Sequence, residues 1–241
     1  MSTKYQFVRP FLMISCIMLF LYSCKKNDYI VGGAAHDVNM YKNMSNYDML
    51  KTNPAFDTLV QVIDAAGVKD VINAQGTTFF APSDYSIFSY LNKRTIYVQN
   101  NIDINGKFGL DSLLYYVSNN VNGTKDSLLM YVIKQPLTYD VLKSDGALYP
   151  TALSGDTAAV SYEYTYDEVL GYNSIVSTVP RIVYFTHLWY HYDLDEDNSA
   201  GDIPNDIGVR TLVKTSCILT QNGIVNALEP SHTLFFYGTK Q

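Results

Sequence analysis

The chain has 241 residues, 47% of them hydrophobic, and is therefore long enough to bury a sizeable core. Its 17 basic and 23 acidic residues give a net charge of −6, and the absence of a basic block argues against nucleic acid as a partner. Such an acidic balance suits a solvated surface protein.

The first 23 residues have the pattern of a secretory signal. Lys4 and Arg9 form a positively charged start, and the apolar run over residues 11–21 is too short to span a bilayer comfortably. The next stretch, Leu21–Cys24, reads LYSC and resembles a bacterial lipobox, with Cys24 as the lipidated residue. The alternatives are an uncleaved anchor and an ordinary signal peptide.

Several acyl chains on Cys24 would attach the protein stably to a membrane. Lys25 and Lys26 follow instead of an acidic residue, and in Gram-negative lipoproteins that favours the outer membrane, with the domain periplasmic or surface-exposed. Because Cys16 would be removed with the signal and Cys24 would carry lipid, we expect Cys217 to have no disulfide partner in the mature chain. We interpret Cys217 as a small buried hydrophobe rather than a reactive thiol.

Residues 24–46 are rich in Asn, Gly and Lys and lack hydrophobic periodicity, which predicts a flexible tether. Residues 47–239 are expected to form a single domain, since 218 residues remain after removal of residues 1–23 (241 − 23 = 218). Dropping Lys4 and Arg9 leaves 15 basic against 23 acidic residues, a net charge of −8.

The first predicted helix opens at Asn53-Pro54 and ends at Gly67, with Phe56, Leu59, Val60 and Ile63 on one apolar face. A short turn over residues 69–73 follows. Residues 78–81 then favour a strand that stops at Pro82.

Ser83 is a good N-cap for a second helix, and Asp84 places a negative charge in its first turn. Ile87, Phe88 and Leu91 recur at helical spacing, and Lys93-Arg94 suits the C-terminal end.

The long stretch over residues 92–123 contains three turn signals, Asn100-Asn101, Asn105-Gly106 and Asn122-Gly123. We expect a helix over residues 110–117, a strongly apolar helix over residues 128–133 capped by Asp126, and a last helix over residues 139–142 capped by Thr138.

From Gly146 onwards the pattern changes to period two, which is typical of strands. Asn222-Gly223 is the clearest hairpin turn. The expected strands are a run around residues 160–166 and the segments 172–178, 181–188, 209–213, 215–220, 224–228 and 233–237. Helices first and strands afterwards indicate an α+β fold.

Few residues suggest chemistry, and we expect neither a metal nor another cofactor. His187 and His191 are four apart in a predicted strand, about 13 Å, which is too far for a shared metal. His232 is interpreted as a hydrogen-bonded structural histidine. No G-x-S-x-G elbow or glycine-rich phosphate loop occurs, so we expect no catalytic activity.

Asp193, Asp195 and Asp197 begin like a calcium loop, but glycine is missing at the sixth position and Pro204 stands at the twelfth. A solvated acidic loop is the preferred interpretation. Beside it, Trp189, Tyr190 and Tyr192 are possible ligand contacts, since exposed aromatic rings stack on sugars or pack on a protein partner.

A second aromatic group is the row Tyr162, Tyr164 and Tyr166 among the chain's 21 tyrosines. The simpler interpretation is that this row faces the core or decorates a sheet.

Two segments resemble the signatures of fasciclin-type domains. The first is a T-[VF]-F-A-P-[TS]-[DN]-x-A-F pattern, and the second is an N-G-[IV]-[IV]-x-x-[IL]-[DE] hairpin near the domain end. The matching residues are Thr78, Phe79, Phe80, Ala81, Pro82, Ser83, Asp84 and Phe88, followed by Asn222, Gly223, Ile224 and Val225. The resemblance implies a strand-rich wedge with an N-terminal helical cap, in which the two segments share one sheet.

The family usually has a Tyr-His pair at the end of the helix expected here over residues 128–133, but this chain has Met130-Tyr131. The resemblance, the lipobox and the lack of catalytic residues together favour a lipid-anchored adhesion or binding module at the cell surface. Its partner would be a surface protein or a glycan. The alternative is an accessory glycan-binding lipoprotein of an outer-membrane polysaccharide-uptake system.

Overall fold

The computed structural model describes residues 40–168, 179–195 and 198–240. The chain divides into two units, Met1–Asp37 and Val38–Gln241, and all described residues belong to the second. The proposed signal, Cys24 and the strand expected over residues 172–178 lie outside the described residues. Within the described ranges, no helix has both the length and the apolar character needed to cross a membrane.

The N-terminal part of the second unit is helical. It contains α2 (Asn46–Lys51), η1 (Pro54–Phe56), α3 (Asp57–Ala66) and α4 (Lys69–Ile72). The side chain of Asn53 accepts from the backbone N–H of Ala55, and Gly67 ends α3 with a φ of 65°, as the sequence predicts. Asn46, the last residue of the expected tether, is the buried first residue of α2.

Strand β1 (Thr77–Ala81) is wholly buried and is followed by α5 (Asp84–Asn101). Ser83 occupies the N-cap position, but its side chain makes no capping hydrogen bond. The basic pair Lys93-Arg94 predicts the C-terminal end of this helix, but the helix continues to Asn101. No glycine or proline interrupts it before that residue. Its apolar pattern is also misleading, since Phe88 is 63% exposed and the buried face carries Ser86, Ile87 and Tyr90.

The helix predicted over residues 110–117 is confirmed as α6 (Leu110–Ser118). The helix predicted over residues 128–133 is wrong. Three short elements and a strand occupy the region, namely η2 (Val121–Gly123), α7 (Thr124–Ser127), η3 (Leu128–Tyr131) and β2 (Val132–Ile133). The β-branched Val132 and Ile133 are extended because they pair with β1.

Residues 139–142 also do not form the expected helix. A single turn replaces it, in which the N–H groups of Val141 and Leu142 both donate to the carbonyl of Thr138. Thr138 therefore begins a turn that is not continued.

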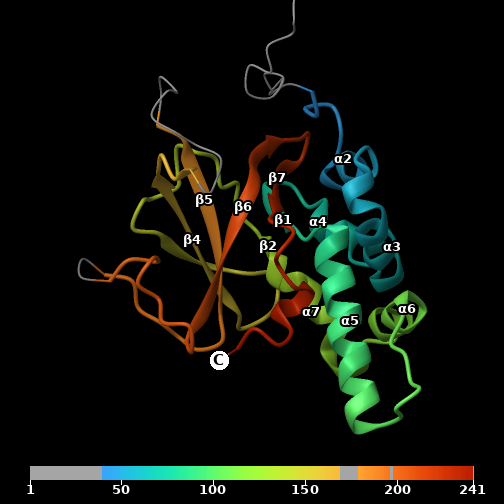
Figure 1. Cartoon of the computed structure of the whole chain (residues 1–241). Helices are drawn as coiled ribbons and strands as arrows, with labels where there is room; N and C mark the ends of the chain where they lie inside the picture. Colours follow the sequence, from blue (N-terminus) through green and yellow to red (C-terminus); the bar gives the residue numbers. More distant parts are fainter. Residues whose placement is uncertain (1–39, 169–178, 196–197, 241) are drawn as a thin grey trace, which may run out of the picture. The chain divides into compact units, whose positions relative to one another are not determined.

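The remaining strands are β3 (Ala147–Pro150), β4 (Thr157–Tyr164), β5 (Arg181–Leu188), β6 (Gly208–Leu219) and β7 (Gly223–Leu228). The sheet order is β2-β1-β7-β6-β5-β4-β3, antiparallel except for the parallel pair β1–β7. β2 and β3 are the two edge strands of this sheet. A bridge between Ile133 in β2 and Thr151, the residue after β3, brings the two edges together. Figure 1 shows α2, α3, α5 and α6 together on one side of this sheet.

The predicted α+β fold class is confirmed, with a helical N-terminal part and a strand-rich remainder. Two strand predictions need correction. The strands expected over residues 209–213 and 215–220 are one irregular strand, β6, whose register shifts against β7. Residues 233–237 contain η5 (Leu234–Phe236) instead of a strand, because Phe235 and Phe236 adopt positive φ angles.

The two signature segments pair directly, as expected. Thr77 stands opposite Gly223 and Phe79 opposite Val225 in the parallel pair β1–β7. Asn222 ties the turn before β7 to the N-terminal helices, since its Oδ1 accepts from the N–H of Asn46 at 2.8 Å and its Nδ2 donates to the carbonyl of Asn73. The core lies between the sheet and these helices, where Phe80 and Phe185 meet with ring centroids 4.5 Å apart.

Replacing Gly223 by alanine is expected to lower the free energy of unfolding by about 2–4 kcal/mol, the range of a severe core clash. A Cβ at this position would lie 2.1 Å from the carbonyl oxygen of Thr77 and 2.9 Å from Nδ2 of Asn46, so the β1 backbone and the buried Asn46 side chain would have to move. Urea unfolding followed by circular dichroism measures the change. The matched control is Gly201→Ala, whose Cβ would have Ser199 Oγ as its nearest neighbour at 3.4 Å. Equal stability of both variants would contradict the prediction.

Candidate functional site

A small hollow of about 250 Å³ lies where β5 ends. One wall is formed by Ser154, Gly155 and Asp156 in the turn before β4 and by Thr157 at the start of β4. The other wall is the segment from Leu188 to His191. The backbone N–H of Trp189 donates to the carbonyl of Ile207 at 2.8 Å and fixes the start of that segment. Two of the three predicted aromatic contacts, Trp189 and Tyr190, therefore line one hollow, whereas Tyr192 is not among its lining residues.

The two rings differ in exposure. Trp189 is half-buried and packs against the core, while Tyr190 is 55% exposed. Nζ of Lys240 donates to the hydroxyl of Tyr190 at 2.8 Å and lies 4.2 Å from the centroid of its ring. This contact holds the Tyr190 ring in place beside the hollow.

The opposite wall is polar. Oδ2 of Asp156 accepts from Oγ1 of Thr151 at 2.7 Å, and burial raises the pKa of this carboxyl group. Hydroxyl and carboxylate groups lining the same hollow as aromatic rings can bind a sugar, because sugar hydroxyls hydrogen-bond to the oxygens while the C–H face packs on a ring.

Tyr162 and Tyr164 at the end of β4 form a separate cluster, whereas Tyr166 lies beyond the strand. The rings of Tyr162 and Tyr164 meet edge to face at 5.4 Å, and the guanidinium of Arg181 lies 4.6 Å from the Tyr162 centroid. Arg181 also donates to the carbonyl of Tyr139 at 2.7 Å. Tyr162 is half-buried, whereas Tyr164 and Tyr166 are exposed, so the row continues the sheet beyond the core.

The first signature segment serves the fold. Oγ1 of Thr78 donates to the carbonyl of Gln135 at 2.7 Å and accepts from the N–H of Leu137 at 2.8 Å. The carboxylate of Asp84 accepts from the N–H groups of Thr58 and Leu59, so it caps the N-terminus of α3. Buried members of the same signature are Phe79, Phe80, Ala81, Pro82 and Ser83.

The second signature has the same character. Ile224 and Val225 are buried, and Asn222 and Gly223 make the contacts described above. Of the twelve signature positions, only Phe88 presents a large exposed apolar surface.

Two histidines are buried near the last turn of the chain. Nε2 of His232 lies 2.8 Å from the hydroxyl of Tyr131, which also accepts from the N–H of Phe235 at 2.7 Å. His187 stacks on Phe236 with centroids 4.6 Å apart, and its Nδ1 has no partner in the part of the chain that the structure describes. The structural role predicted for His232 agrees with these contacts.

Burial shifts both histidines in the same direction. Desolvation lowers the pKa of His187 to about 4, and desolvation together with the neighbouring His187 and Lys93 lowers the pKa of His232 to about 3. Both imidazoles are therefore neutral in the folded chain at physiological pH.

The residues weighed as metal ligands do not assemble into a site within the described ranges. No cluster there combines three or more His, Cys, Asp or Glu side chains in an arrangement that could hold an ion. His191 instead contacts Asp193 at 3.0 Å, and Oδ1 of Asp195 accepts from the N–H and Nδ2 of Asn198. Asp197 lies outside the described residues.

Cys217 is half-buried in β6, and its Sγ donates to the carbonyl of Leu137 at 3.7 Å. Burial raises the pKa of this thiol to about 11. At neutral pH the thiol is protonated and therefore a poor nucleophile, in line with the prediction from the sequence.

The sequence did not reveal a groove of about 360 Å³ beside α5. The helical spacing of Ile87, Phe88 and Leu91 does not distinguish the exposed Phe88 from the buried Ile87. Lys107 lies between the turn signal at Asn105-Gly106 and the helix predicted over residues 110–117. The sequence offers only a partial signal, because Tyr85, Phe88 and Ile96 mark a second apolar stripe on α5 but of these three only Phe88 lines the groove.

Comparison with solved structures finds similarity to a fasciclin-type protein. This chain is similar to a FAS1 domain pair from the insect cell adhesion molecule Fasciclin I, with a TM-score of 0.44 and 17% sequence identity. The match covers 77% of this chain and 46% of the Fasciclin I chain. The chain thus spans less than half of that protein. No family model matches the sequence, and no curated protein matches it.

The buried histidines predict a loss of stability in acid. Because both pKa values are lower in the folded chain than the ordinary value of about 6.5, the unfolded chain takes up protons first. Stability contributed by the neutral imidazoles is complete above about pH 7 and falls as the pH drops from about 6.5 toward 4. Urea unfolding at pH 7 and pH 5 measures this loss.

His187→Phe is expected to remove about half of the loss between pH 7 and pH 5, since one of two buried imidazoles then no longer titrates. Phenylalanine keeps the stack on Phe236 and leaves no buried Nδ1 without a partner. The matched control is His191→Gln, which replaces a largely exposed histidine outside the buried pair. A wild-type-like pH dependence in His187→Phe would refute the assignment.

Proposed function

We propose that this chain is a non-catalytic binding module at the cell surface that holds a carbohydrate between Tyr190 and the turn before β4. The observation that carries the proposal is the pairing of an exposed, Lys240-held Tyr190 ring with a hollow whose far wall is hydroxyl and carboxylate. Sugars are bound by this combination of a ring and convergent hydrogen-bonding groups.

In this arrangement, different side chains contact the apolar face and the hydroxyl groups of the sugar. Tyr190 and the accessible part of Trp189 take the apolar face of the sugar, and Ser154, Asp156 and Thr157 take its hydroxyl groups. The half-buried Trp189 anchors the platform to the core, so little ordering is needed when the ligand arrives. A protein partner packing on the same rings is the competing occupant.

The signature segments support the further proposal that the chain contains a fasciclin-type domain. Their residues pair in one sheet, and their Asn, Gly and Asp members each have a defined structural task. The proposed role in adhesion follows from the family resemblance of these residues, and the glycan-uptake role remains the alternative.

Tyr190→Ala is expected to weaken carbohydrate binding about five- to tenfold, the effect of losing one stacked aromatic ring. The experiment applies the purified chain to a printed array of neutral and acidic glycans and then measures the best binder by calorimetry. Tyr115→Ala is the matched control, because Tyr115 is similarly exposed on α6, away from the hollow. An array without a binder, or equal affinity of both variants, would contradict the proposal.

We further propose that acyl chains on Cys24 attach the module to the outer membrane. Cys24→Ser is expected to move the protein from the membrane fraction to the soluble fraction of a Gram-negative host, since each buried CH₂ contributes about 0.8 kcal/mol to anchoring. Cys217→Ser serves as control and should remain membrane-bound, because Cys217 lies within β6. Membrane retention of Cys24→Ser would reject the anchor and leave the carbohydrate site untouched.

A further inference from the structure

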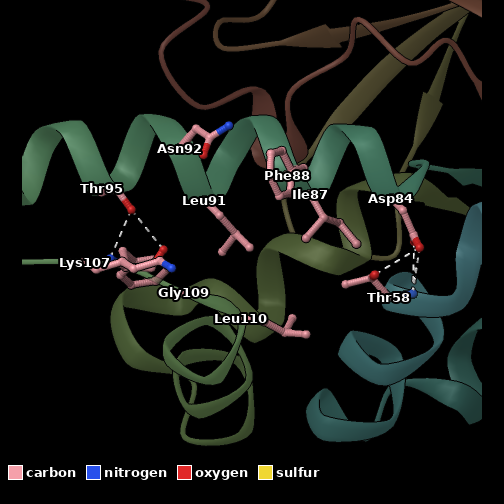
Figure 2. Close-up of a pocket in the computed structure, with 11 residues that line it drawn as sticks. Thr58, Asp84, Ile87, Phe88, Leu91, Asn92, Thr95, Lys107, Gly109 and Leu110 are labelled. Carbon is pink, nitrogen blue, oxygen red and sulfur yellow. Dashed lines mark hydrogen bonds between the residues drawn. The ribbon is translucent and has the colours of Figure 1, made fainter.

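The groove beside α5 is a second candidate site, independent of the hollow at Tyr190. Its volume of about 360 Å³ lies at the lower end of the range for small-molecule sites, about 300–1,000 Å³. Figure 2 shows Ile87, Phe88 and Leu91 on one side of the groove, projecting from α5, and Leu110 at the start of α6 on the other.

The middle of the groove is apolar. Ile87 and Phe108 are buried at its base, and Leu91 and Leu110 are half-buried. Phe88 stands at the rim with 63% of its surface exposed, so an apolar ligand in the groove would remove a large ring surface from water. The groove therefore favours a ligand with an apolar body.

One end of the groove carries a cation on a fixed backbone. Oγ1 of Thr95 donates to the carbonyl of Phe108 and accepts from its N–H, each at 3.1 Å, which fastens residue 108 to α5. The adjacent Lys107 is exposed and makes no hydrogen bond or ion pair with any residue that the structure describes. Asn92, also exposed, lines the groove one turn before Thr95 and offers an amide N–H₂.

The other end is acidic. Asp84 lies there, held by Thr58 and Leu59, as the dashed lines in Figure 2 show for Thr58. Asp84 and Thr95 are eleven residues apart on α5 (95 − 84 = 11), which corresponds to about 16 Å along the helix axis. A negative group on a ligand is thus attracted to the Lys107 end and repelled from the Asp84 end.

We propose that this groove binds an amphipathic carboxylate, with its carboxyl group at Lys107 and Asn92 and its apolar chain along Phe88 and Leu91 toward Asp84. The charge at the two ends sets the direction of the ligand, and the apolar walls supply most of the affinity. A neutral sugar, which suits the hollow at Tyr190, lacks the apolar surface that these walls would cover.

Calorimetry with dodecanoate below its micelle-forming concentration tests the proposal on the whole chain. The expected result is saturable one-to-one binding that is weaker for dodecanol, which has the same chain and no charge. Phe88→Ser is expected to weaken dodecanoate binding about tenfold through lost apolar contact, and Lys107→Gln about fivefold through lost ion pairing. In Lys107→Gln, dodecanoate should lose its advantage over dodecanol.

Two control variants have similar exposure outside the groove. Ile96→Ser changes an exposed residue of α5, and Lys214→Gln changes an exposed residue of β6. Both variants should bind dodecanoate as the wild type does. Unchanged circular dichroism and thermal unfolding of each variant confirm that it is folded. Equal affinity of all five proteins would overturn the proposal.

Further measurements separate the source of the ligand from other occupants. Flotation with phosphatidylglycerol vesicles that is lost in Phe88→Ser and Lys107→Gln, in addition to dodecanoate binding, would support the same anionic amphiphile presented by a lipid surface. Self-association that Phe88→Ser abolishes, in sedimentation experiments without dodecanoate binding, would assign the groove to a second copy of the chain and overturn the proposal. Loss of glycan binding does not affect these measurements, because the hollow at Tyr190 shares no lining residue with the groove.

Discussion

The parallel pairing of β1 with β7 is the constraint on which the rest of the fold depends. Parallel strands cannot be joined by a tight hairpin, so the chain between Ala81 and Gly223 forms one long connection that contains α5, α6 and most of the sheet. The pairing requires close approach of two backbones, and Gly223 permits it because a side chain would overlap the carbonyl of Thr77. Asn222 then ties the turn to Asn46 and Asn73, which brings the N-terminal helices onto the same sheet.

The residues that make this arrangement have little capacity left for a ligand. Asp84 uses its carboxylate to cap α3, Thr78 uses its hydroxyl to hold residues 135–137, and the amide of Asn222 is bonded on both sides. Binding surfaces instead occur where connections leave the sheet and the helices, as is common for proteins with a rigid framework. The turn before β4 and the segment after β5 form one such surface, and the segment between α5 and α6 forms the other.

The sequence predicted those parts of the fold that depend on local patterns. Gly67 ends α3, and the period-two run that begins at Val160 marks the second half of β4, because both signals lie within a few neighbouring residues. Predictions failed where distant partners decide. Val132 and Ile133 continue an apolar run that suits a helix, yet pairing with β1 makes them extended. Similarly, the hydroxyl of Tyr131 holds the N–H of Phe235 in a turn that the sequence presents as a strand.

The candidate sites follow the same division. Trp189 and Tyr190 stood out because aromatic side chains beside a polar loop are visible in one stretch of sequence. Their partners Asp156 and Lys240 did not, since they come from separate parts of the chain. The groove was missed because Phe88 has the spacing of a buried residue, and only the position of residues 107–110 shows which face of α5 is covered.

The C-terminal segment links these surfaces physically. Near its start, Oγ1 of Thr233 lies 3.0 Å from Oγ of Ser89, and the carbonyl of Tyr237 accepts from Nζ of Lys93, so the segment lies along α5. Three residues after Tyr237, Lys240 holds the ring of Tyr190. Between Thr233 and Tyr237 the chain makes a strained turn at Phe235 and Phe236, and the Phe236 ring packs on the two buried histidines. The C-terminal segment that helps to bury His187 and His232 therefore also contacts the helix that carries the groove and the ring that borders the polar hollow.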